Sequence, residues 1–332
     1  MRTRKLSNIG VIGLGQIGGS IARSLSDYSD VVFYARSENV RGLGRSAGLI
    51  AAESVEELSR LADTIFLAVP VDQTGSVLEE LLPHLRPGHM LTDVGSTKVE
   101  VTESVGRLKL PRGVSFIGGH PMAGNTSSGF SGSDPALFNN CRWVLTIETG
   151  SPLCDVEALV SLMGIITDGL GAEVVVLEPK VHDQLVASVS HVEHLIASAL
   201  VELVRNSGRE RLAAVLAAGS FRDATRVAMS SADMAVPFLK SNPFLRETVE
   251  EFTQCLNRLS QRVSNQSAFV ESWESARIWR EKLEGVNASA GEFELDYTED
   301  LVSELIRLSL SGRVFSGIEA TESKVIIKSR SI

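Results

Sequence analysis

The sequence predicts an α/β fold in which a doubly wound parallel sheet is followed by a helical domain. Two observations lead to this prediction. Short β-branched segments alternate with helical patterns up to residue 177. Beyond that residue strand signals almost vanish, and apolar residues recur at helical spacing. With 332 residues the chain has room for two domains, and we expect them at residues 1–178 and 179–332.

The predicted strands of the first domain are near-continuous apolar segments, typical of parallel strands covered by helices on both faces. They are residues 9–12, 31–34, 64–69, 90–94, 114–117, 143–146 and 173–177. Helical patterns separate several of these segments, for example at residues 54–61 and 74–82.

The second domain is predicted to begin at Glu178-Pro179, because proline is favoured in the first turn of a helix. Apolar residues then recur every three or four positions from Leu185 to Leu203, and again from Leu245 to Val263. The tail after residue 285 reads as a loop followed by one helix, at residues 297–310.

Composition narrows the classes of function. The net charge of −9 offers no basic surface for nucleic acid or an anionic membrane, so an anionic substrate would need a locally positive pocket. The three cysteines lack metal-ligand spacing and are typical of reduced thiols in the cytoplasm. No apolar run of about 18 residues occurs, and we expect no membrane span.

Residues 13–18 read Gly-Leu-Gly-Gln-Ile-Gly between a predicted strand and a predicted helix. In this context Gly13 permits a tight turn, Gly15 lets the backbone approach a pyrophosphate, and Gly18 allows close helix–strand packing. The motif predicts a dinucleotide site of the Rossmann type, lined also by Gln16 and Ile17. The alternative is a plain glycine turn.

The end of the second predicted strand bears on the choice of cofactor. An NAD site usually has an acidic residue about 20 positions after the glycine motif, but here the sequence reads Ala35-Arg36-Ser37. Arg36 could pair with a 2′-phosphate and Ser37 could donate to it, which favours NADP over NAD. Otherwise Arg36 is a solvated surface residue. We expect Val69 and Pro70, after the third strand, to line the same site.

Four further stretches carry candidate chemistry: DVGSTK at 93–98, GGHPMAG at 118–124, SHVEH at 190–194 and FRDATR at 221–226. Each also has a structural interpretation. A single histidine after a strand is usually a hydrogen-bonded turn residue, and arginines among helices often pair with acids. His191 and His194 could be a metal pair, but no third ligand is in register, and we expect no metal.

Taken in order, GVIGLGQIGGSIA, DVGSTK, GGHPMAG, SHVEHL and FRDATR resemble the prephenate/arogenate dehydrogenase family over residues 8–280. The resemblance implies a Rossmann domain followed by a helical domain that forms a homodimer. It also implies NAD(P)-dependent oxidative decarboxylation of a cyclohexadienyl substrate in tyrosine biosynthesis.

The resemblance also implies roles for single residues. His120 is the catalytic base, a role that its ordinary pKa near 6.5 suits, and Ser96 hydrogen-bonds the substrate hydroxyl. His194 and Arg226 bind substrate, with His191 one turn away from His194. Arg226 would supply the local positive charge that the acidic chain requires.

The chain departs from the family pattern at two places. After HPMAG the usual Glu-Lys-Ser-Gly is missing, and Asn125 and Thr126 stand beside the expected substrate. Glu193 replaces a usual proline and would suit an ammonium group if it faces the pocket. The substrate therefore stays open among prephenate, arogenate and 4-amino-4-deoxyprephenate.

Two other interpretations stay open. One is another Rossmann oxidoreductase, a β-hydroxyacid dehydrogenase or imine reductase, which would typically rely on a lysine in the helical domain; Lys180 is the only early candidate. The other is a non-catalytic NADP-binding protein. The tail is too short for a regulatory ACT module, and we expect its helix to extend the dimer interface.

Overall fold

The computed structural model describes residues 8–124, 129–284, 289–298 and 300–331. All the strands of this part of the chain belong to one sheet, in the order β3-β2-β1-β4-β5-β6-β7-β8-β10-β11-β9. The strands are β1 Ile9–Ile12, β2 Val31–Tyr34, β3 Ile50–Ala51, β4 Thr64–Leu67, β5 Met90–Asp93, β6 Ser115–Pro121, β7 Arg142–Thr146, β8 Glu173–Leu177, β9 Ala290–Asp296, β10 Arg313–Ala320 and β11 Lys324–Ser331.

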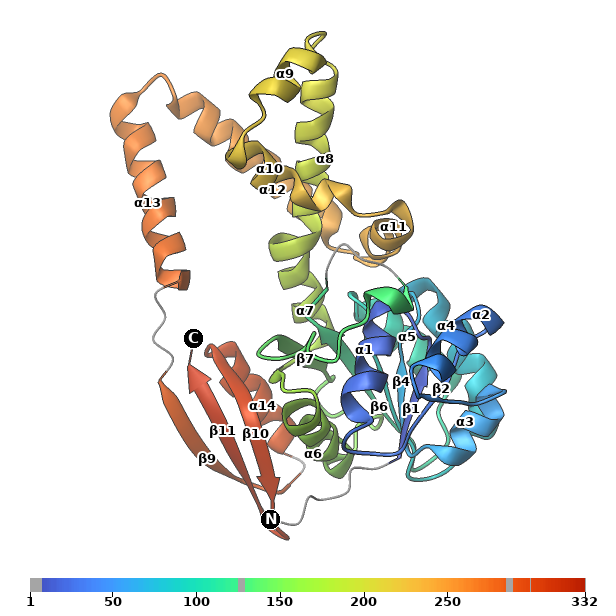
Figure 1. Cartoon of the computed structure of the whole chain (residues 1–332). Coiled ribbons are helices and arrows are strands. Elements are labelled where there is room, and N and C mark those ends of the chain that lie inside the picture. The colour runs from blue at the N-terminus through green and yellow to red at the C-terminus, as the bar shows by residue number, and fades with distance from the viewer. Residues whose placement is uncertain (1–7, 125–128, 285–288, 299, 332) are drawn as a thin grey trace.

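The N-terminal part is the predicted doubly wound α/β unit. Strands β3 to β6 pair in parallel, and helices cover both faces of the sheet (Figure 1). The helices are α1 Gln16–Leu25, α2 Glu38–Ser46, α3 Val55–Leu61, α4 Val71–Leu81, α5 Val99–Leu108 and α6 Val156–Gly164. Helices α1 and α6 contribute to one core cluster, and α3, α4 and α5 to the other. The strand order reverses between β1 and β4, which is where such sheets bind ligands.

Strand β6 is longer than predicted. It continues through the glycine pair to Pro121, and residues 118–121 pair antiparallel with β7. His120 therefore lies in a strand opposite Val144 and not in a turn, as the structural alternative for this histidine assumed. The glycines are required by close neighbours: a Cβ on Gly119 would lie 2.5 Å from the carbonyl oxygen of Asp93, and one on Gly118 would overlap the Thr146 hydroxyl.

The helical part begins at Pro179, as predicted, with the proline in the first turn. Figure 1 shows it as a separate layer above the sheet, with α13 standing apart from the other helices. Its helices are α7 Pro179–Val186, α8 Val192–Arg205, α9 Glu210–Leu216, α10 Gly219–Thr225, α11 Ala232–Ser241, α12 Leu245–Arg262 and α13 Gln266–Glu284, and a π-helical segment, Ala187–His191, joins α7 to α8.

The prediction for the tail is wrong in part. A helix is present, α14 Leu301–Leu310, but three strands accompany it. Strand β10 pairs with β8 of the N-terminal sheet, β11 with β10, and β9 with β11, all antiparallel. The tail therefore covers a sheet edge that would otherwise expose unpaired backbone groups.

Helix α14 packs against β8 and belongs to the core of the N-terminal part. The Ser309 side chain accepts a 3.0 Å hydrogen bond from the backbone N–H of Val176. The buried face of the helix thus belongs to the core of its own chain, and the expectation that the helix extends a dimer interface stays a prediction. The alternating pattern Glu292-Phe293-Glu294-Leu295-Asp296 is the strand signal that a loop interpretation overlooks.

One helical segment of the described residues, Pro179–Arg205, is long and apolar enough by composition alone to cross a membrane, with a mean hydropathy of 1.2 over 18 residues. Its buried face carries His182 and Asp183, both hydrogen-bonded to other parts of the protein. Exposed apolar residues, including Leu185, Val189 and Leu203, lie on other parts of the segment. An apolar helix of this kind is also typical of a protein–protein interface.

Candidate active site

The glycine loop between β1 and α1 has the shape of a dinucleotide site. Gly13 has φ +96, and a Cβ there would overlap the carbonyl oxygen of Ala68. At Gly18 a Cβ would overlap the Gly13 carbonyl oxygen and come within 2.8 Å of Ala68. A Cβ at Gly15 would meet nothing within 4 Å, so open space lies in front of this residue at the N-terminus of α1. The loop therefore fits a pyrophosphate, whose negative charge the helix N-terminus favours.

The other predicted cofactor residues surround this loop. Gln16 and Ile17 form the first turn of α1, and Val69 and Pro70 connect β4 to α4. Arg36 is exposed at the end of β2 and donates a hydrogen bond to Gln73 of α4.

Ser37, next to Arg36, is the residue at the N-cap of α2, and its side chain makes no capping hydrogen bond. Both groups thus lie at the carboxyl end of β2, where a ribose and its 2′-substituent bind in folds of this class.

A buried ion pair supports the carboxyl ends of β5 and β6. Lys98 is fully buried and pairs with Asp93, and its ammonium donates a 2.7 Å hydrogen bond to the carbonyl oxygen of Gly119. The Asp93 carboxylate also accepts from the backbone N–H groups of Gly95 and Gly119, at 2.8 and 3.1 Å. These contacts fix the backbone of Gly119, the residue immediately before the candidate base His120.

His120 belongs to a chain of hydrogen bonds that crosses between the two parts of the protein. Its Nδ1 lies 2.9 Å from Nε2 of His182, on α7. Nδ1 of His182 lies 2.7 Å from Oδ1 of Asp183. The Asp183 carboxylate accepts backbone hydrogen bonds from Lys98 and Val99, at 2.8 and 2.9 Å, at the start of α5.

The environment keeps His120 neutral. Burial, followed by the nearby His182, Lys98 and His191, lowers the pKa of His120 well below its usual range. Burial also lowers the pKa of His182, although the hydrogen bond to Asp183 opposes this shift. A neutral imidazole can accept a proton at neutral pH, so the site has the main property that a general base requires.

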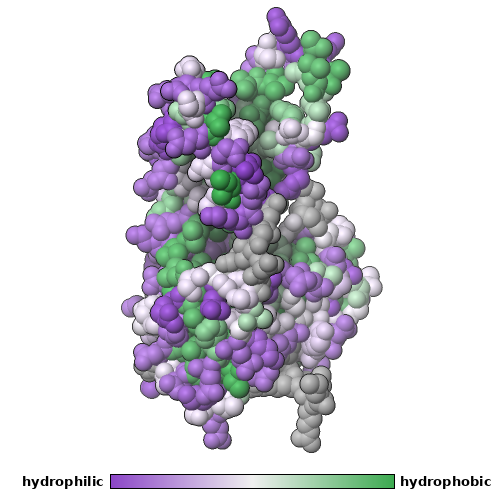
Figure 2. Space-filling view, turned by 90° about the vertical axis from the view of Figure 1, so that its left-hand side faces the viewer, coloured by the Kyte–Doolittle hydropathy of each residue, from purple (hydrophilic) through white to green (hydrophobic). Residues whose placement is uncertain are grey.

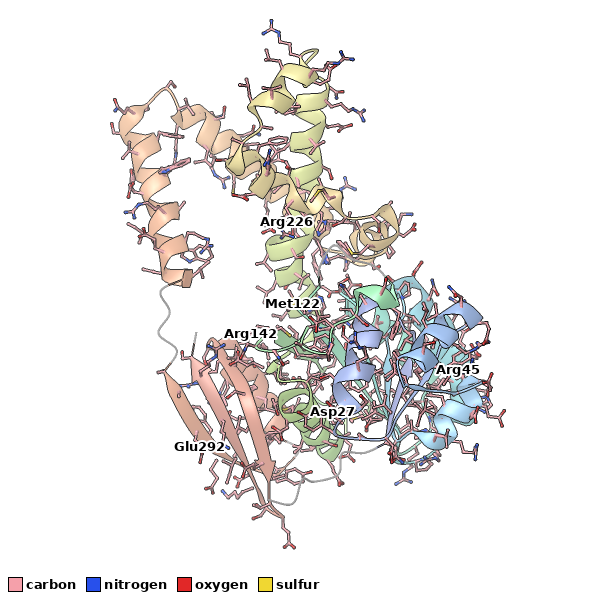
Figure 3. All side chains as sticks on the ribbon, in the orientation of Figure 1. Asp27, Arg45, Met122, Arg142, Arg226 and Glu292 are labelled. Atoms are coloured by element: carbon pink, nitrogen blue, oxygen red, sulfur yellow. The ribbon has the colours of Figure 1, made fainter. Side chains whose placement is uncertain are left out.

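The predicted substrate residues of the helical part lie on α8 and the segment after α10. His194 is half-buried, and its ring contacts Phe238 edge-on, with centroids 5.2 Å apart. Arg226 is exposed and close enough to both His194 and Glu193 to affect their pKa values. In Figure 3 Arg226 lies above Met122, at the junction of the helical part with the end of β6. Glu193 is exposed.

His191, which was predicted to bind substrate, is packed inside the helical part. It is buried, its ring stacks on Phe238 with centroids 4.6 Å apart, and its Nδ1 lies 3.0 Å from the amide nitrogen of Asn242. The same amide donates a 2.9 Å hydrogen bond to the backbone oxygen of Asp183. His191 therefore connects α7, α8 and α11 next to the hydrogen-bond chain of His120, His182 and Asp183, which we call the relay. Direct contact of His191 with substrate stays a prediction.

Ser96 lies in the loop between β5 and α5, partly buried. Since β5 and β6 are neighbouring parallel strands, this loop and the end of β6 lie at the same edge of the sheet. Asn125 and Thr126 are outside the described residues, so their predicted contact with substrate stays untested. Among the described residues no group of three or more His, Cys, Asp or Glu side chains could hold a metal ion.

Sequence reasoning missed His182, Asp183 and the ion pair of Asp93 with Lys98. A signal was present for the first two: positions 179, 182, 183 and 186 are the buried face of α7. A His-Asp dipeptide on the apolar face of a helix has to be hydrogen-bonded, because burying an unpaired charge is very unfavourable. No comparable signal in the sequence identifies Asp93 as the partner of Lys98.

Comparison with known proteins agrees with this geometry. The nucleotide-binding domain of prephenate dehydrogenase matches residues 21–176, and its dimerization domain matches residues 178–272. A prephenate dehydrogenase from Lactococcus lactis subsp. cremoris is 34% identical over 289 residues, which are 84% of this chain and 78% of the relative.

Two solved structures are also similar. Synechocystis arogenate dehydrogenase has a TM-score of 0.72 and 30% identity, covering 83% of this chain and 99% of the other. Prephenate dehydrogenase from Aquifex aeolicus, in complex with hydroxyphenyl propionate and NAD+, has a TM-score of 0.75 and 25% identity, covering 84% and 98%. The chain belongs to the prephenate dehydrogenase family.

Proposed function

We propose that the protein catalyses NAD(P)-dependent oxidative decarboxylation of a cyclohexadienyl substrate in aromatic amino acid biosynthesis. The observation that carries this proposal is a neutral, nearly buried His120 at the same sheet edge as an intact dinucleotide loop. When bound, the nicotinamide accepts the hydride that leaves ring carbon C4 of the substrate.

The residues of the chain handle the proton. As hydride leaves C4, the O–H bond of the C4 hydroxyl breaks and His120 takes the proton, so that a carbonyl forms. The ring carboxylate then departs as CO2, and its bonding electrons make the ring aromatic. The phenolate oxygen takes the proton back from His120, so the base is regenerated. Ser96 hydrogen-bonds the hydroxyl, and Arg226 holds a substrate carboxylate.

A single substitution tests the base. His120→Asn removes the proton acceptor and should lower kcat by about 10²–10⁴-fold, with little change in cofactor affinity. Steady-state kinetics together with a cofactor titration measure both quantities. A nearly normal kcat would contradict the assignment.

The finer choice of cofactor and substrate rests on fewer residues. Exposed Arg36 and Ser37, in place of an acidic residue, favour NADP over NAD. The decisive experiment measures turnover of prephenate, arogenate and 4-amino-4-deoxyprephenate, each with NAD+ and NADP+. We expect turnover of at least one, with kcat/KM higher for NADP+; turnover of none would contradict the proposed function.

The rival oxidoreductase class loses support from the position of Lys180. That side chain is exposed at the start of α7, whereas a catalytic lysine would have to face the cofactor site. The buried lysine is Lys98, which is committed to Asp93. The other lysines of the described helical part, Lys240 and Lys282, are exposed as well.

We also infer a homodimer that works in the cytoplasm. The matched dimerization domain includes α8 and α12, where Leu195, Leu203, Leu256 and Leu259 are exposed. Figure 2 shows hydrophobic patches among hydrophilic ones over the helical upper part of the molecule. A second copy would cover such a surface. Light scattering of the purified protein should give twice the 35.7 kDa of one chain.

A further inference from the structure

We propose that His182 and Asp183 set the tautomer of His120, so that Nδ1 carries the hydrogen and Nε2 is the atom that accepts the substrate proton. His182 and Asp183 are positioning residues, since they act through His120. The inference rests on the proposed function in naming Nε2 as the catalytic atom, but the tautomer itself can be measured without any reaction.

The argument begins at Asp183, where the direction of every hydrogen bond is determined. Oδ1 accepts the backbone N–H of Lys98, and Oδ2 accepts that of Val99. Both oxygens are thus acceptors, the role of an ionised carboxylate. Nδ1 of His182, 2.7 Å from Oδ1, must therefore carry a hydrogen and donate it.

The next bond follows from the chemistry of imidazole. A neutral imidazole carries one hydrogen, so a His182 that donates from Nδ1 has a lone pair on Nε2. The Nε2 atom that carries this lone pair lies 2.9 Å from Nδ1 of His120. Two lone pairs at this distance would repel, so Nδ1 of His120 must donate, and the lone pair of neutral His120 is on Nε2.

The surroundings of His120 leave Nε2 available. Within the part of the chain that the structure describes, no hydrogen bond is made by this atom. His120 keeps 9% of its surface exposed, so the ring is not sealed off. A free lone pair on a nearly buried ring is what proton abstraction from a bound hydroxyl requires.

The relay joins the two parts of the protein. His120 lies on β6, whereas His182 and Asp183 lie on α7, the first helix of the helical part. The position of α7 is fixed by the backbone bonds to the start of α5 and by Asn242, which donates to the Asp183 backbone oxygen at 2.9 Å. The base thus has its productive tautomer only when α7 is docked against the sheet.

The charges around the relay also favour hydrogen bonds that run from His120 through His182 to Asp183. When Nε2 accepts a proton, the new imidazolium donates through Nδ1 to His182, and the Asp183 carboxylate lies at the end of the chain. The other titratable groups that affect these rings are Lys98, Asp93 and His191. Lys98 is already paired with Asp93, and burial lowers the pKa of His191 to about 4. Asp183 is therefore the anion that compensates the transient positive charge.

The direct test is the nitrogen chemical shifts of the histidine rings in ¹⁵N-labelled wild-type protein without substrate. The chain has six histidines, so assignment by single substitution is feasible. At neutral pH we expect hydrogen on Nδ1 for both His120 and His182. Hydrogen on Nε2 of His120 would overturn the proposal, whatever the enzyme's substrate proves to be.

A kinetic test uses two variants of one residue. His182→Gln can still place an acceptor oxygen near Nδ1 of His120, whereas His182→Leu cannot. We expect kcat to stay within about fivefold of wild type for the glutamine variant. For the leucine variant we expect a fall of about 10²-fold, because His120 is free to adopt the wrong tautomer, and KM changes of less than about threefold in both.

The matched control is Gln184→Ala, an exposed position on the same helix, which should leave kcat unchanged. Equal kcat values for the glutamine and leucine variants would overturn the relay, because a merely structural role would not distinguish them. If wild-type protein turns over none of the substrates, the proposed function fails, while the nitrogen shifts still decide the tautomer.

Discussion

At the scale of single residues, five of the six histidines have a pKa below the usual value. Burial lowers the pKa of His89, His120, His182, His191 and His194. Each of these groups binds a proton less readily in the folded chain than in the unfolded chain. Between the unfolded and the folded pKa the unfolded state binds more protons, so stability must rise with pH in that interval.

His191 gives this effect a measurable size. Its pKa falls to about 4 through burial, so its share of the stability is present above pH 6.5 and is lost as the pH falls to about 4. Linkage gives that share as about 3 kcal/mol. Urea unfolding of wild type and His191→Gln from pH 7.5 to 4 should show a steeper loss for wild type. Parallel curves would contradict the assignment of this group.

Arg226 provides a second test at this scale. Arg226→Ala removes a charge-assisted fork to a substrate carboxylate and should raise KM by about 10–100-fold, with a smaller effect on kcat. Arg222→Ala is the matched control, since it removes another exposed arginine, one turn earlier on α10. Steady-state kinetics measure both; equal KM values for the two variants would mean that Arg226 does not bind substrate.

At the scale of elements, the β1–α1 loop separates two uses of glycine. Gly18 is close to Gly13 and Ala68, whereas Gly15 faces open space. The first is needed for packing, and the second for the approach of a ligand. Gly118 and Gly119 are also needed for packing, because an added Cβ would meet Thr146 or Asp93. They therefore continue strand β6, although a glycine pair usually indicates a turn.

Two alanine substitutions check that distinction. Gly18→Ala should lower the free energy of unfolding by about 1–3 kcal/mol through overpacking. Gly15→Ala should leave stability nearly unchanged but weaken cofactor binding at least about tenfold, because its methyl group occupies the space in front of the helix. Thermal unfolding and a fluorescence titration with NADPH measure the two effects.

The control for both substitutions is Gly106→Ala. This glycine occupies an exposed position on α5, and no neighbour lies within 4 Å of an added Cβ. A helical alanine there should raise stability by up to about 1 kcal/mol and leave NADPH affinity unchanged. Equal loss of stability at positions 15 and 18 would contradict the proposed roles.

At the scale of the whole molecule, the tail returns to the first domain instead of remaining with the helical part. Figure 1 shows β9, β10, β11 and α14 beside the sheet, on the far side from α2. The carboxylate of Glu173 on β8 bridges Arg142 of β7 and Arg330 of β11. Residues distant in sequence thus complete one sheet and one core.

Substitution of two leucines of α14 distinguishes a helix that packs in its own core from a dimer arm, that is, a helix that extends the dimer interface. Leu305 is fully buried in the core, whereas Leu310 is 61% exposed. Leu305→Ala should lower the free energy of unfolding by about 2–5 kcal/mol without changing the dimer, and Leu310→Ala should change it by less than about 0.5 kcal/mol. Chemical unfolding and light scattering measure both; a Leu305 variant that dissociates while keeping its stability would restore the dimer-arm interpretation.

The sequence by itself determined the local parts of this protein. Apolar runs and the glycine spacing specify the strands β1, β2 and β4 to β8 and the nucleotide loop, because hydrophobic periodicity and steric demand are properties of neighbouring residues. The two-residue strand β3 has no such signal. The motif around His120 and the start of α7 at Pro179 are local in the same sense.

Only the tertiary structure decided what depends on contacts across the chain. The pairing of Lys98 with Asp93, the relay from His120 through His182 to Asp183, and the addition of β10 to β8 all join separate elements. The hydrogen bonds and burial that fix them exist only after those elements have packed. For this reason the sequence indicates a base at position 120, whereas the fold determines which of its nitrogens is free to accept the proton.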